Sequence, residues 1–503
     1  MMYGEEKSDL LIVAAKLANN PQGAESVERR SGAKGNAEQP HMRRTQSRES
    51  MSQRLSRVRE AAKQRKKERF TALFHLLTAE ALENAFLSLS RKAAAGVDGV
   101  RWKDYAENLK VNIADLHRRL HQGSYRAQPG RRHYIPKADG KQRPLGIASL
   151  EDKIVQYALV KILNAVYEND FMGFSYGFRP GRSQHNALDA LATGLVRTNV
   201  NWVLDADISQ FFDKVSHEWL IRFIEHRIGD QRVIRLIRKW LTAGTSEEGE
   251  WRASEEGEWR ASEEGTPQGA VISPLLANIY LHYVFDLWAH QWRRRHATGN
   301  VVMVRYADDI VIGFDKRIDA QCFRIAMQRR LKEFGLTVHP KKTRLTEFGR
   351  FAAENRASRG KGKPETFNFL GFTHISGKDR SGRFMLIRKT RRDRMTATLK
   401  AIKDGLRKRW HYSIPEQGKW LRRVVQGYLN YHSVPGNYPM MRKFRIYVTD
   451  LWRRALRRRS QQDDTTWTKA NRLAAVWLPK VRVLHPWPVE RFTARHPRQE
   501  PGA

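Results

Sequence analysis

The segment that most constrains how this chain folds consists of two apolar runs joined by adjacent aspartates. Residues 301–306 read Val-Val-Met-Val-Arg-Tyr, and residues 309–314 read Asp-Ile-Val-Ile-Gly-Phe. Their β-branched and aromatic content, with the short link through Ala307 and Asp308, predicts a β-hairpin with acid at its tip. Aspartates are common in tight turns, so an ordinary solvated turn is the alternative. Acids this close to buried strands nevertheless need a compensating cation.

A second apolar strand is expected at the start of residues 202–213, where it runs into acids and an aromatic pair. On its own, this segment is equally compatible with a strand-end turn whose carboxylates are solvated. If Asp207 and Asp308 converge, they offer the hard oxygen ligands that Mg²⁺ prefers. Such a pair suits two-metal phosphoryl transfer, in which one ion activates a 3′-hydroxyl and the other neutralises the leaving pyrophosphate. Asp309 is then an auxiliary catalytic acid, and the Ile208 backbone carbonyl is a further candidate metal ligand.

A turn followed by a helix is expected in residues 266–280, between the two acidic segments. Ser273 is expected to cap the helix N-terminus, with Pro274 at the first helical position. Gly269 would let a nucleic-acid strand approach the backbone closely, because glycine has no Cβ. A plain helix start explains the Ser-Pro pair equally well.

The overall charge indicates the kind of partner that this chain binds. Lysine and arginine number 92 against 53 acids, which gives a formal net charge of +39 over 503 residues. A polyanion, by default nucleic acid, is the expected partner, and a cationic surface without a ligand is the alternative. Cys322 is the only cysteine, which excludes disulfides and Cys-paired zinc sites. Since no apolar run approaches 18 residues, a membrane span is not expected.

The chain divides into segments of different composition. Residues 1–66 are basic and poor in large apolar groups, so a mostly disordered tail is expected, with order beginning near Phe70 in a helix up to Leu89. A tandem repeat in residues 246–261 is interpreted as a lengthened surface hairpin whose acidity disfavours RNA contact. Basic amphipathic helices are expected over residues 388–459, followed by a proline-punctuated extended strap.

Taken in order, these motifs resemble the palm of reverse transcriptases, and their flanks resemble proteins encoded by group II introns. Further matching blocks lie at residues 135–147, 174–183, 335–343 and 367–372. The resemblance runs from about Phe70 to Phe492. It implies an α+β right-hand polymerase, divided into a tail (1–66), fingers and palm with antiparallel sheet (67–386), a helical thumb or maturase (X) domain (387–462) and a C-terminal extension (463–503).

The same resemblance implies an activity, cofactors and partners. It implies an RNA-directed DNA polymerase, a nucleotidyltransferase that uses two Mg²⁺ ions and deoxynucleoside triphosphates on a DNA target or primer. The family member would bind its group II intron RNA, assist splicing and copy the intron into DNA during retrotransposition. A bacterial cytoplasmic, nucleoid-associated location and a homodimer are compatible with this family.

Two alternatives to this activity stay open. One is a splicing-only maturase without polymerase activity, and the other is a reverse transcriptase of a bacterial defence or diversity-generating system. The maturase-like thumb argues against the second alternative. Because paired cysteines are absent and little chain follows Phe492, the C-terminal endonuclease of many relatives is not expected.

The resemblance assigns nucleotide-binding roles to four residues. Lys137 and Arg143 would grip the triphosphate, Gln268 would bind the nucleotide, and Phe212 would exclude ribonucleotides, although a core phenylalanine is the alternative for Phe212. A two-residue turn at 139–140 would place Lys137 opposite Gln142, with Arg143 facing the other way unless the hairpin is bulged.

The remaining assigned residues are expected to contact template, primer or intron RNA. Basic side chains among aromatic ones suit backbone and stacking contacts, while a solvated helix face is the alternative for the thumb residues. These residues are Gly269, Arg179, Lys341, Lys342, Arg442, Lys443, Arg453 and Arg454.

Overall fold

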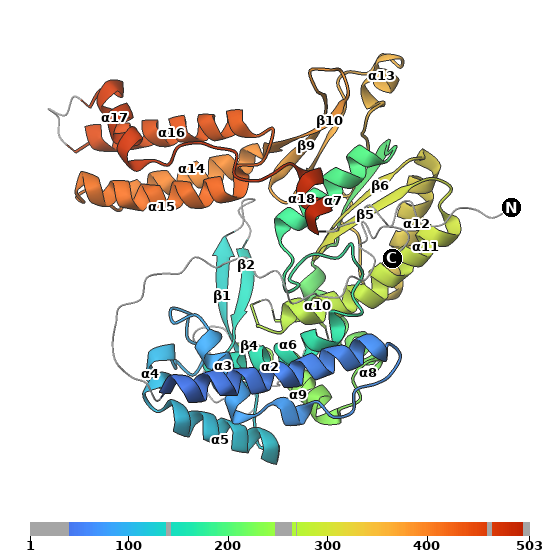
Figure 1. Ribbon diagram of the computed structural model, residues 1–503, viewed down its shortest axis with the longest axis vertical. Coiled ribbons are helices and arrows are strands. Elements are labelled where there is room, and N and C mark those ends of the chain that lie inside the picture. Colours follow the sequence, from blue (N-terminus) through green and yellow to red (C-terminus); the bar gives the residue numbers. More distant parts are fainter. Residues whose placement is uncertain (1–39, 137–141, 247–263, 268, 460–464, 496–503) are drawn as a thin grey trace.

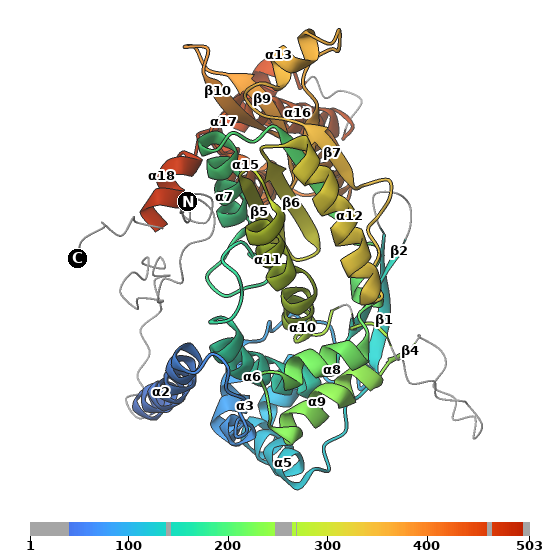
Figure 2. The same ribbon diagram turned by 90° about the vertical axis from the view of Figure 1, so that its right-hand side faces the viewer.

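The computed structural model describes residues 40–136, 142–246, 264–267, 269–459 and 465–495. A group of helices forms one end of the molecule, a sheet with its covering helices forms the middle, and a helical bundle forms the other end (Figure 1). A two-stranded hairpin, β1–β2, points from the first group of helices toward the bundle. The view turned by 90° shows the same order of parts (Figure 2), which agrees with the α+β architecture of fingers, palm and thumb expected from the sequence.

Order begins well before Phe70, contrary to expectation. Residues 40–64 form helix α2 (Pro40–Gln64), which lies against α6 (Leu150–Tyr167). The reason is a sparse apolar stripe, hidden by the charged composition, that packs on the core at near-helical spacing. Its members are Met51, Leu55, Val58 and Ala62. The prediction of a mostly disordered tail is therefore wrong for residues 40–64, while residues 1–39 lie outside the described residues.

The helix expected from Phe70 to Leu89 is shorter in the structure. A 3₁₀ turn at Phe74–Leu76 precedes α3 (Ala79–Ser88), because the Thr78 hydroxyl caps α3 by accepting a hydrogen bond from the Ala81 amide. Four further helices complete this end of the molecule. They are α4 (Trp102–Glu107), α5 (Leu109–Gln122), α8 (His217–Glu225) and α9 (Gln231–Thr242).

The fingers hairpin has a different register from the one expected. Strands β1 (Gly130–Pro136) and β2 (Gln142–Ile147) pair Pro136 with Gln142 and Ile135 with Arg143. The predicted two-residue turn is therefore wrong, since Gln142 lies opposite Pro136 and not opposite Lys137. With this register there is no longer a reason to expect Arg143 on the wrong face of the hairpin. The short strand β4 (Thr245–Ser246) pairs with β1 in parallel, and residues 247–261 of the repeat lie outside the described residues.

The palm is built on a four-stranded antiparallel sheet in the order β5-β6-β3-β7. Its strands are β3 (Trp202–Asp207), β5 (Val301–Tyr306), β6 (Asp309–Phe314) and β7 (Arg344–Glu347). The predicted hairpin and the predicted strand in residues 202–213 are both confirmed, and the strand ends at Asp207. Helices α7 (Gln184–Arg197) and α12 (Arg317–Glu333) pack against the sheet. Neighbouring segments are η2 (Phe211–Asp213), α10 (Ser273–Leu281), the π-helical η3 (His282–Asp286) and α11 (Leu287–His296).

A second sheet connects the palm to the thumb. It comprises β8 (Thr366–Phe369), β9 (Phe372–Lys378) and β10 (Phe384–Thr390), beside the short helix α13 (Ala352–Ala357). The thumb helices are α14 (Arg392–Arg407), α15 (Ile414–His432) and α16 (Tyr438–Arg457), which share one apolar core. The predicted helix break at 435–437 is confirmed. The other break lies at 408–413, slightly earlier than the predicted 413–415, because Ile414 and Pro415 form the first turn of α15.

The C-terminal strap is partly helical rather than extended throughout. Helix α17 (Trp467–Trp477) packs on the thumb, and α18 (Pro488–Arg495) returns to the palm and lies against α7 (Figure 1). The extended stretch connects these two helices, and buried Phe492 fixes α18 to the palm core. Among the described residues, no helix has the length and apolarity that crossing a membrane requires.

Candidate active site

The sheet register brings the predicted acids together at one end of the palm. Asp207 of β3 lies directly opposite Asp309 of β6, and Asp308 occupies the adjoining turn. Asp205 precedes Asp207 by two residues, so its side chain projects from the same face of the sheet. Like charges in directly opposed positions destabilise a sheet. This end of the palm therefore requires a cation.

The acids also perturb one another's protonation. Desolvation, with the charges of Asp308 and Asp207, raises the pKa of Asp309 to about 6. Desolvation, with the charges of Asp309 and Asp207, raises the pKa of Asp205 to about 7. Perturbed carboxyl groups that share a site are typical of functional centres.

A lysine supplies positive charge at this cluster. Lys342 donates a hydrogen bond from Nζ to Asp207 Oδ2 at 2.7 Å, while Lys341 is exposed beside it. Lys342 therefore lies among the acids, not on a separate nucleic-acid track. Both lysines come from the segment after α12, which bridges to β3 through Ile208 and Val338.

The donor set fits magnesium ions that also use substrate oxygens. Among the described residues, no group of three or more histidine, cysteine, aspartate or glutamate side chains forms a metal cage. Mg²⁺ in nucleotide enzymes is commonly held by one or two carboxylates with phosphates and waters, which Asp207 and Asp308 can match. The bridge to Val338 uses the Asp207 carbonyl and the Ser209 amide, so the Ile208 carbonyl takes no part in it.

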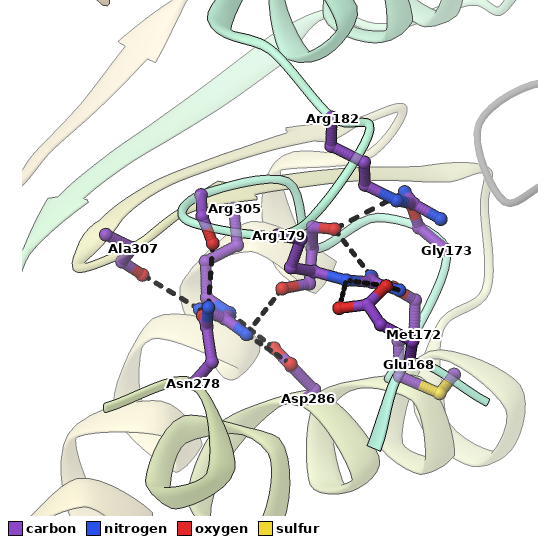
Figure 3. Close-up of polar contacts among 11 residues, drawn as sticks. Glu168, Met172, Gly173, Arg179, Arg182, Asn278, Asp286, Arg305 and Ala307 are labelled. Atoms are coloured by element: carbon purple, nitrogen blue, oxygen red, sulfur yellow. Dashed lines mark hydrogen bonds and ion pairs between the residues drawn. The ribbon is translucent and has the colours of Figure 1, made fainter. Parts of the chain in front are cut away.

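Arg305 stabilises the turn that carries Asp308 by donating a hydrogen bond to the carbonyl of Ala307. The guanidinium is fully buried, and its Nε and Nη2 donate to the two carboxylate oxygens of Asp286 at 2.7 and 2.5 Å. Nη1 donates to the Ala307 carbonyl at 3.0 Å and to Asn278 Oδ1 at 3.1 Å, and Nη2 donates to Ser175 Oγ at 2.7 Å (Figure 3). We call Arg305, Asp286, Asn278 and Ser175 the Arg305 network.

Sequence reasoning missed the Arg305 network. The available signal was an arginine inside an otherwise apolar predicted strand, together with Asp286 inside an apolar helix. Each charge alone is unfavourable in a core, so their coexistence indicates an ion pair. The network contacts the backbone of Ala307, which adopts the left-handed conformation with φ +57°. Backbone strain of this kind persists only where surrounding contacts fix it.

The 174–183 block supports the same turn. A Cβ on Gly177 would overlap the Ala307 amide nitrogen, and the Gly177 carbonyl accepts a hydrogen bond from Asn278 at 2.7 Å. The Tyr176 amide donates to the Arg305 carbonyl at 2.8 Å. Glycine is therefore required at position 177, because the two backbones are in contact.

The assignment of Arg179 to nucleic-acid binding is wrong. Its side chain is 3% exposed and pairs with Glu168 at 3.0 Å. Nη1 also donates to the Met172 carbonyl (Figure 3) and to the Ser175 carbonyl, each at 2.8 Å. The guanidinium carbon lies 5.1 Å from the Phe171 ring centroid. Because these groups use its donors internally, Arg179 shapes the loop instead of contacting RNA.

Two details of the 266–280 segment also need correction. Ser273 is the first residue of α10 and not its cap, because its hydroxyl donates to the Pro267 carbonyl at 2.8 Å. Gly269 has φ +110°, and a Cβ there would meet the Gly146 carbonyl oxygen at 2.9 Å. The contact that excludes a side chain at position 269 is thus with strand β2.

The predicted nucleotide-binding residues are only partly described. Phe212 is half-buried and packs edge-on against buried Phe211, and its carbonyl accepts a hydrogen bond from the Thr266 amide at 2.7 Å. Phe212 therefore differs from an ordinary core phenylalanine. Lys137 and Gln268 lie outside the described residues, and Arg143 is described only by its pairing in β2.

The four thumb residues fall into two groups. Arg442 and Lys443 are exposed on α16, and the Lys443 ammonium lies 5.6 Å from the Tyr447 ring centroid. Arg454 is 65% exposed and pairs with Asp450 at 2.7 Å. Arg453 is 15% exposed, pairs with the same carboxylate and stacks over Trp467. The RNA-binding prediction for Arg453 is therefore wrong, since its guanidinium joins α17 to α16.

Comparison with known proteins agrees with this architecture. Residues 135–374 match the family model described as reverse transcriptase (RNA-dependent DNA polymerase). Over this range the chain is similar to reverse transcriptases, and its curated relatives include group II intron-encoded proteins and an intron maturase.

Three curated relatives illustrate the similarity. Protein YkfC of Escherichia coli (strain K12) is 41% identical over 42% of this chain and 54% of its own length. The group II intron-encoded protein LtrA of Lactococcus lactis subsp. cremoris is 36% identical over 45% of this chain and 37% of its own. The putative COX1/OXI3 intron 1 protein of Saccharomyces cerevisiae is 26% identical over 66% of this chain and 46% of its own. The chain thus spans about half or less of the length of these relatives.

Proposed function

We propose that this protein is an RNA-directed DNA polymerase encoded by a group II intron, which binds the intron RNA, assists its splicing and copies it into DNA. The observation that carries the proposal is the placement of Asp207, Asp308 and Asp309 at one end of the palm sheet. A protein that only binds RNA has no need for opposed carboxylates that destabilise the sheet. The matched reverse transcriptase family supports the same activity.

The acids and their neighbours divide the work of phosphoryl transfer. Asp207 and Asp308 would hold two Mg²⁺ ions, which when bound activate the primer 3′-hydroxyl and neutralise the pyrophosphate. Asp309 adds negative charge behind them, and the Ile208 carbonyl would complete the ligand set. Lys342, which donates a hydrogen bond to Asp207 Oδ2, would supply positive charge to the phosphates of a bound nucleotide.

The fingers and the Phe212 position would select the nucleotide. Lys137 and Arg143 would bind the triphosphate, and Gln268 would also bind the nucleotide. Phe212 would crowd the 2′-carbon of the sugar and so favour deoxynucleotides. The support for this role is that Phe212 is half-buried next to Phe211, directly after the acidic strand.

The exposed basic face of the thumb would bind the intron RNA. Arg442, Lys443 and Arg454 lie on α16 among exposed aromatic side chains, which suits contacts with phosphates and unpaired bases. Lys341 would contact the primer–template duplex near the acids. A DNA target or primer, a homodimer and a nucleoid-associated bacterial location are further parts of this proposal.

Primer extension on an RNA template tests the proposal. With Mg²⁺ and deoxynucleotides, the protein should extend a DNA primer annealed to RNA, and chelation of Mg²⁺ should abolish the product. A parallel assay should show faster splicing of the cognate intron RNA. Splicing without any DNA synthesis would instead indicate a maturase that has lost polymerase activity.

A further inference from the structure

Phe178 has an unusual backbone and an unusual exposure for a large aromatic residue. Its φ is +59°, a left-handed conformation that is a genuine outlier for a bulky side chain. Phe178 is 52% exposed, so only part of its apolar surface is buried to offset this strain. Backbone strain of this kind is concentrated at functional positions.

The residues on either side prevent Phe178 from relaxing. Gly177 is in contact with the Ala307 backbone, and its carbonyl is bound by Asn278. Arg179 is buried and bound to Glu168. Since both neighbours are fixed, the chain forces the Phe178 ring outward. The loop thus holds an aromatic ring in solvent at a defined place.

That place is beside the catalytic turn. The Phe178 ring centroid lies 6.3 Å from the Tyr306 ring centroid, with an interplanar angle of 48°. Tyr306 is the last residue of β5, pairs with Asp309 and precedes Asp308 by two residues. The two rings therefore form an aromatic surface at the edge of the acidic cluster, which we call the Phe178–Tyr306 platform.

We propose that the Phe178–Tyr306 platform contacts the 3′-terminal nucleotide of the primer and that Phe178 is a primer-positioning residue. This inference rests on the proposed polymerase function. Tyr306 pairs with Asp309 across the hairpin, and only Ala307 separates it from Asp308, so the platform adjoins the acids. Because the primer end must reach the metal ions that Asp308 would hold, the primer is the strand that passes the platform. Aromatic faces hold nucleotides without sequence preference.

The test separates contact from strain with two substitutions. Phe178→Ala removes the ring, and Phe178→Gly removes the ring and also relieves the left-handed strain. Both should raise the KM for primer–template on the order of 10-fold to 100-fold, the range expected for one aromatic–base contact. The KM for deoxynucleotide and the kcat at saturating primer–template should change less than about 2-fold, and Phe178→Tyr should restore wild-type values. Phe351→Ala, which removes an exposed phenylalanine before α13, is the matched control.

A fluorescent base distinguishes the two strands. 2-Aminopurine at the primer 3′ terminus should be quenched by the wild type and by Phe178→Tyr, and less by Phe178→Gly. An unchanged KM in Phe178→Gly would overturn the inference, as would a change confined to 2-aminopurine at the templating base. If the Phe178 variants lower kcat and the melting temperature but leave the KM for primer–template unaltered, Phe178 has only a structural role and the inference fails. If the wild type binds and quenches the primer probe but makes no DNA, the polymerase proposal fails while the contact stands.

Discussion

Two of the buried arginine networks differ in the parts of the molecule that they join: one lies within the palm, and the other links the palm to β10 and α18. The Arg305 network lies within the palm, where one guanidinium meets Asp286 through two nitrogens and both side chains are fully buried. The second network centres on Asp189 of α7, which pairs with Arg388 of β10 at 3.4 Å and with Arg491 of α18. We call it the Asp189 junction.

The difference indicates a division between catalysis and domain placement. The Arg305 network fixes the turn that carries Asp308 relative to the sheet, and all its members belong to the palm. The Asp189 junction connects residues 199 and 302 positions apart in the chain, so it ties the base of the thumb and the C-terminal helix to the palm. Its second arginine also binds His485, which stacks on His185 at 4.0 Å.

The largest effect is expected from breaking the Arg305 network. Arg305→Met leaves the Asp286 carboxylate buried without a cation, which should lower the free energy of unfolding by about 3–5 kcal/mol. Urea unfolding measures this loss. Arg329→Ala, an exposed arginine on α12, should change the free energy by less than about 0.5 kcal/mol. The double variant Arg305→Met with Asp286→Leu should recover part of the loss, and a single-variant loss under about 1 kcal/mol would contradict this account.

A smaller and more local effect is expected at the Asp189 junction. Arg491→Ala leaves Asp189 with Arg388, so the loss should be about 1–3 kcal/mol and should fall on α18. Hydrogen exchange should show faster exchange in α18 and unchanged protection in β5. Single-nucleotide incorporation should persist, while the average product length falls because the thumb is less firmly held. The control is Arg472→Ala, which removes an exposed arginine on α17. Equal exchange rates of α18 in both variants would exclude a role for Arg491 in docking α18.

The smallest expected effect is a pH dependence of stability that differs between the region of the Asp189 junction and the palm strand that carries Arg305. Burial lowers the pKa of His374 to about 3, with Arg388 adding to the shift, and burial lowers that of His432 to about 4. An unfolded histidine titrates near 6.5, so the unfolded chain binds more protons below that pH and stability falls as pH drops from about 6.5. Each histidine should cost about 1 kcal/mol at pH 5.5.

Hydrogen exchange at pH 7 and pH 5.5 checks this dependence. After correction for intrinsic rates, β9 and α15 should lose protection before β5, because they carry the buried histidines. Equal loss of protection in β5 would show that the acid effect is global. His374→Phe should reduce the difference, since its ring already stacks on Phe367.

The strands and acids of the palm were predictable because their signals are local. Continuous apolar runs rich in β-branched residues predicted β3, β5 and β6, and the acids at the ends of these runs suggested that Asp207 and Asp308 converge. Asp205 was missed as a member of the cluster, although the two-residue spacing to Asp207 was visible in the sequence.

The remaining features depend on contacts that a sequence does not display. The charge of α2 concealed its packing stripe, and Arg179 resembles a nucleic-acid ligand until its partners Glu168 and Met172 are known. The register of β1 and β2 is set by the length of the connecting loop, which composition alone did not give. Long-range ion pairs such as Arg305–Asp286 decide which charges are internal.

We propose that the acids at the end of the palm sheet form a metal-dependent polymerase centre. Single-turnover extension of a primer on an RNA template tests this for the wild type and for Asp308→Ala. Asp404→Ala, which removes an exposed acid on α14, is the control. Asp308→Ala should slow incorporation on the order of 10³-fold or more, with splicing of the intron RNA retained, while Asp404→Ala remains at the wild-type rate. Wild-type incorporation by Asp308→Ala would contradict the account.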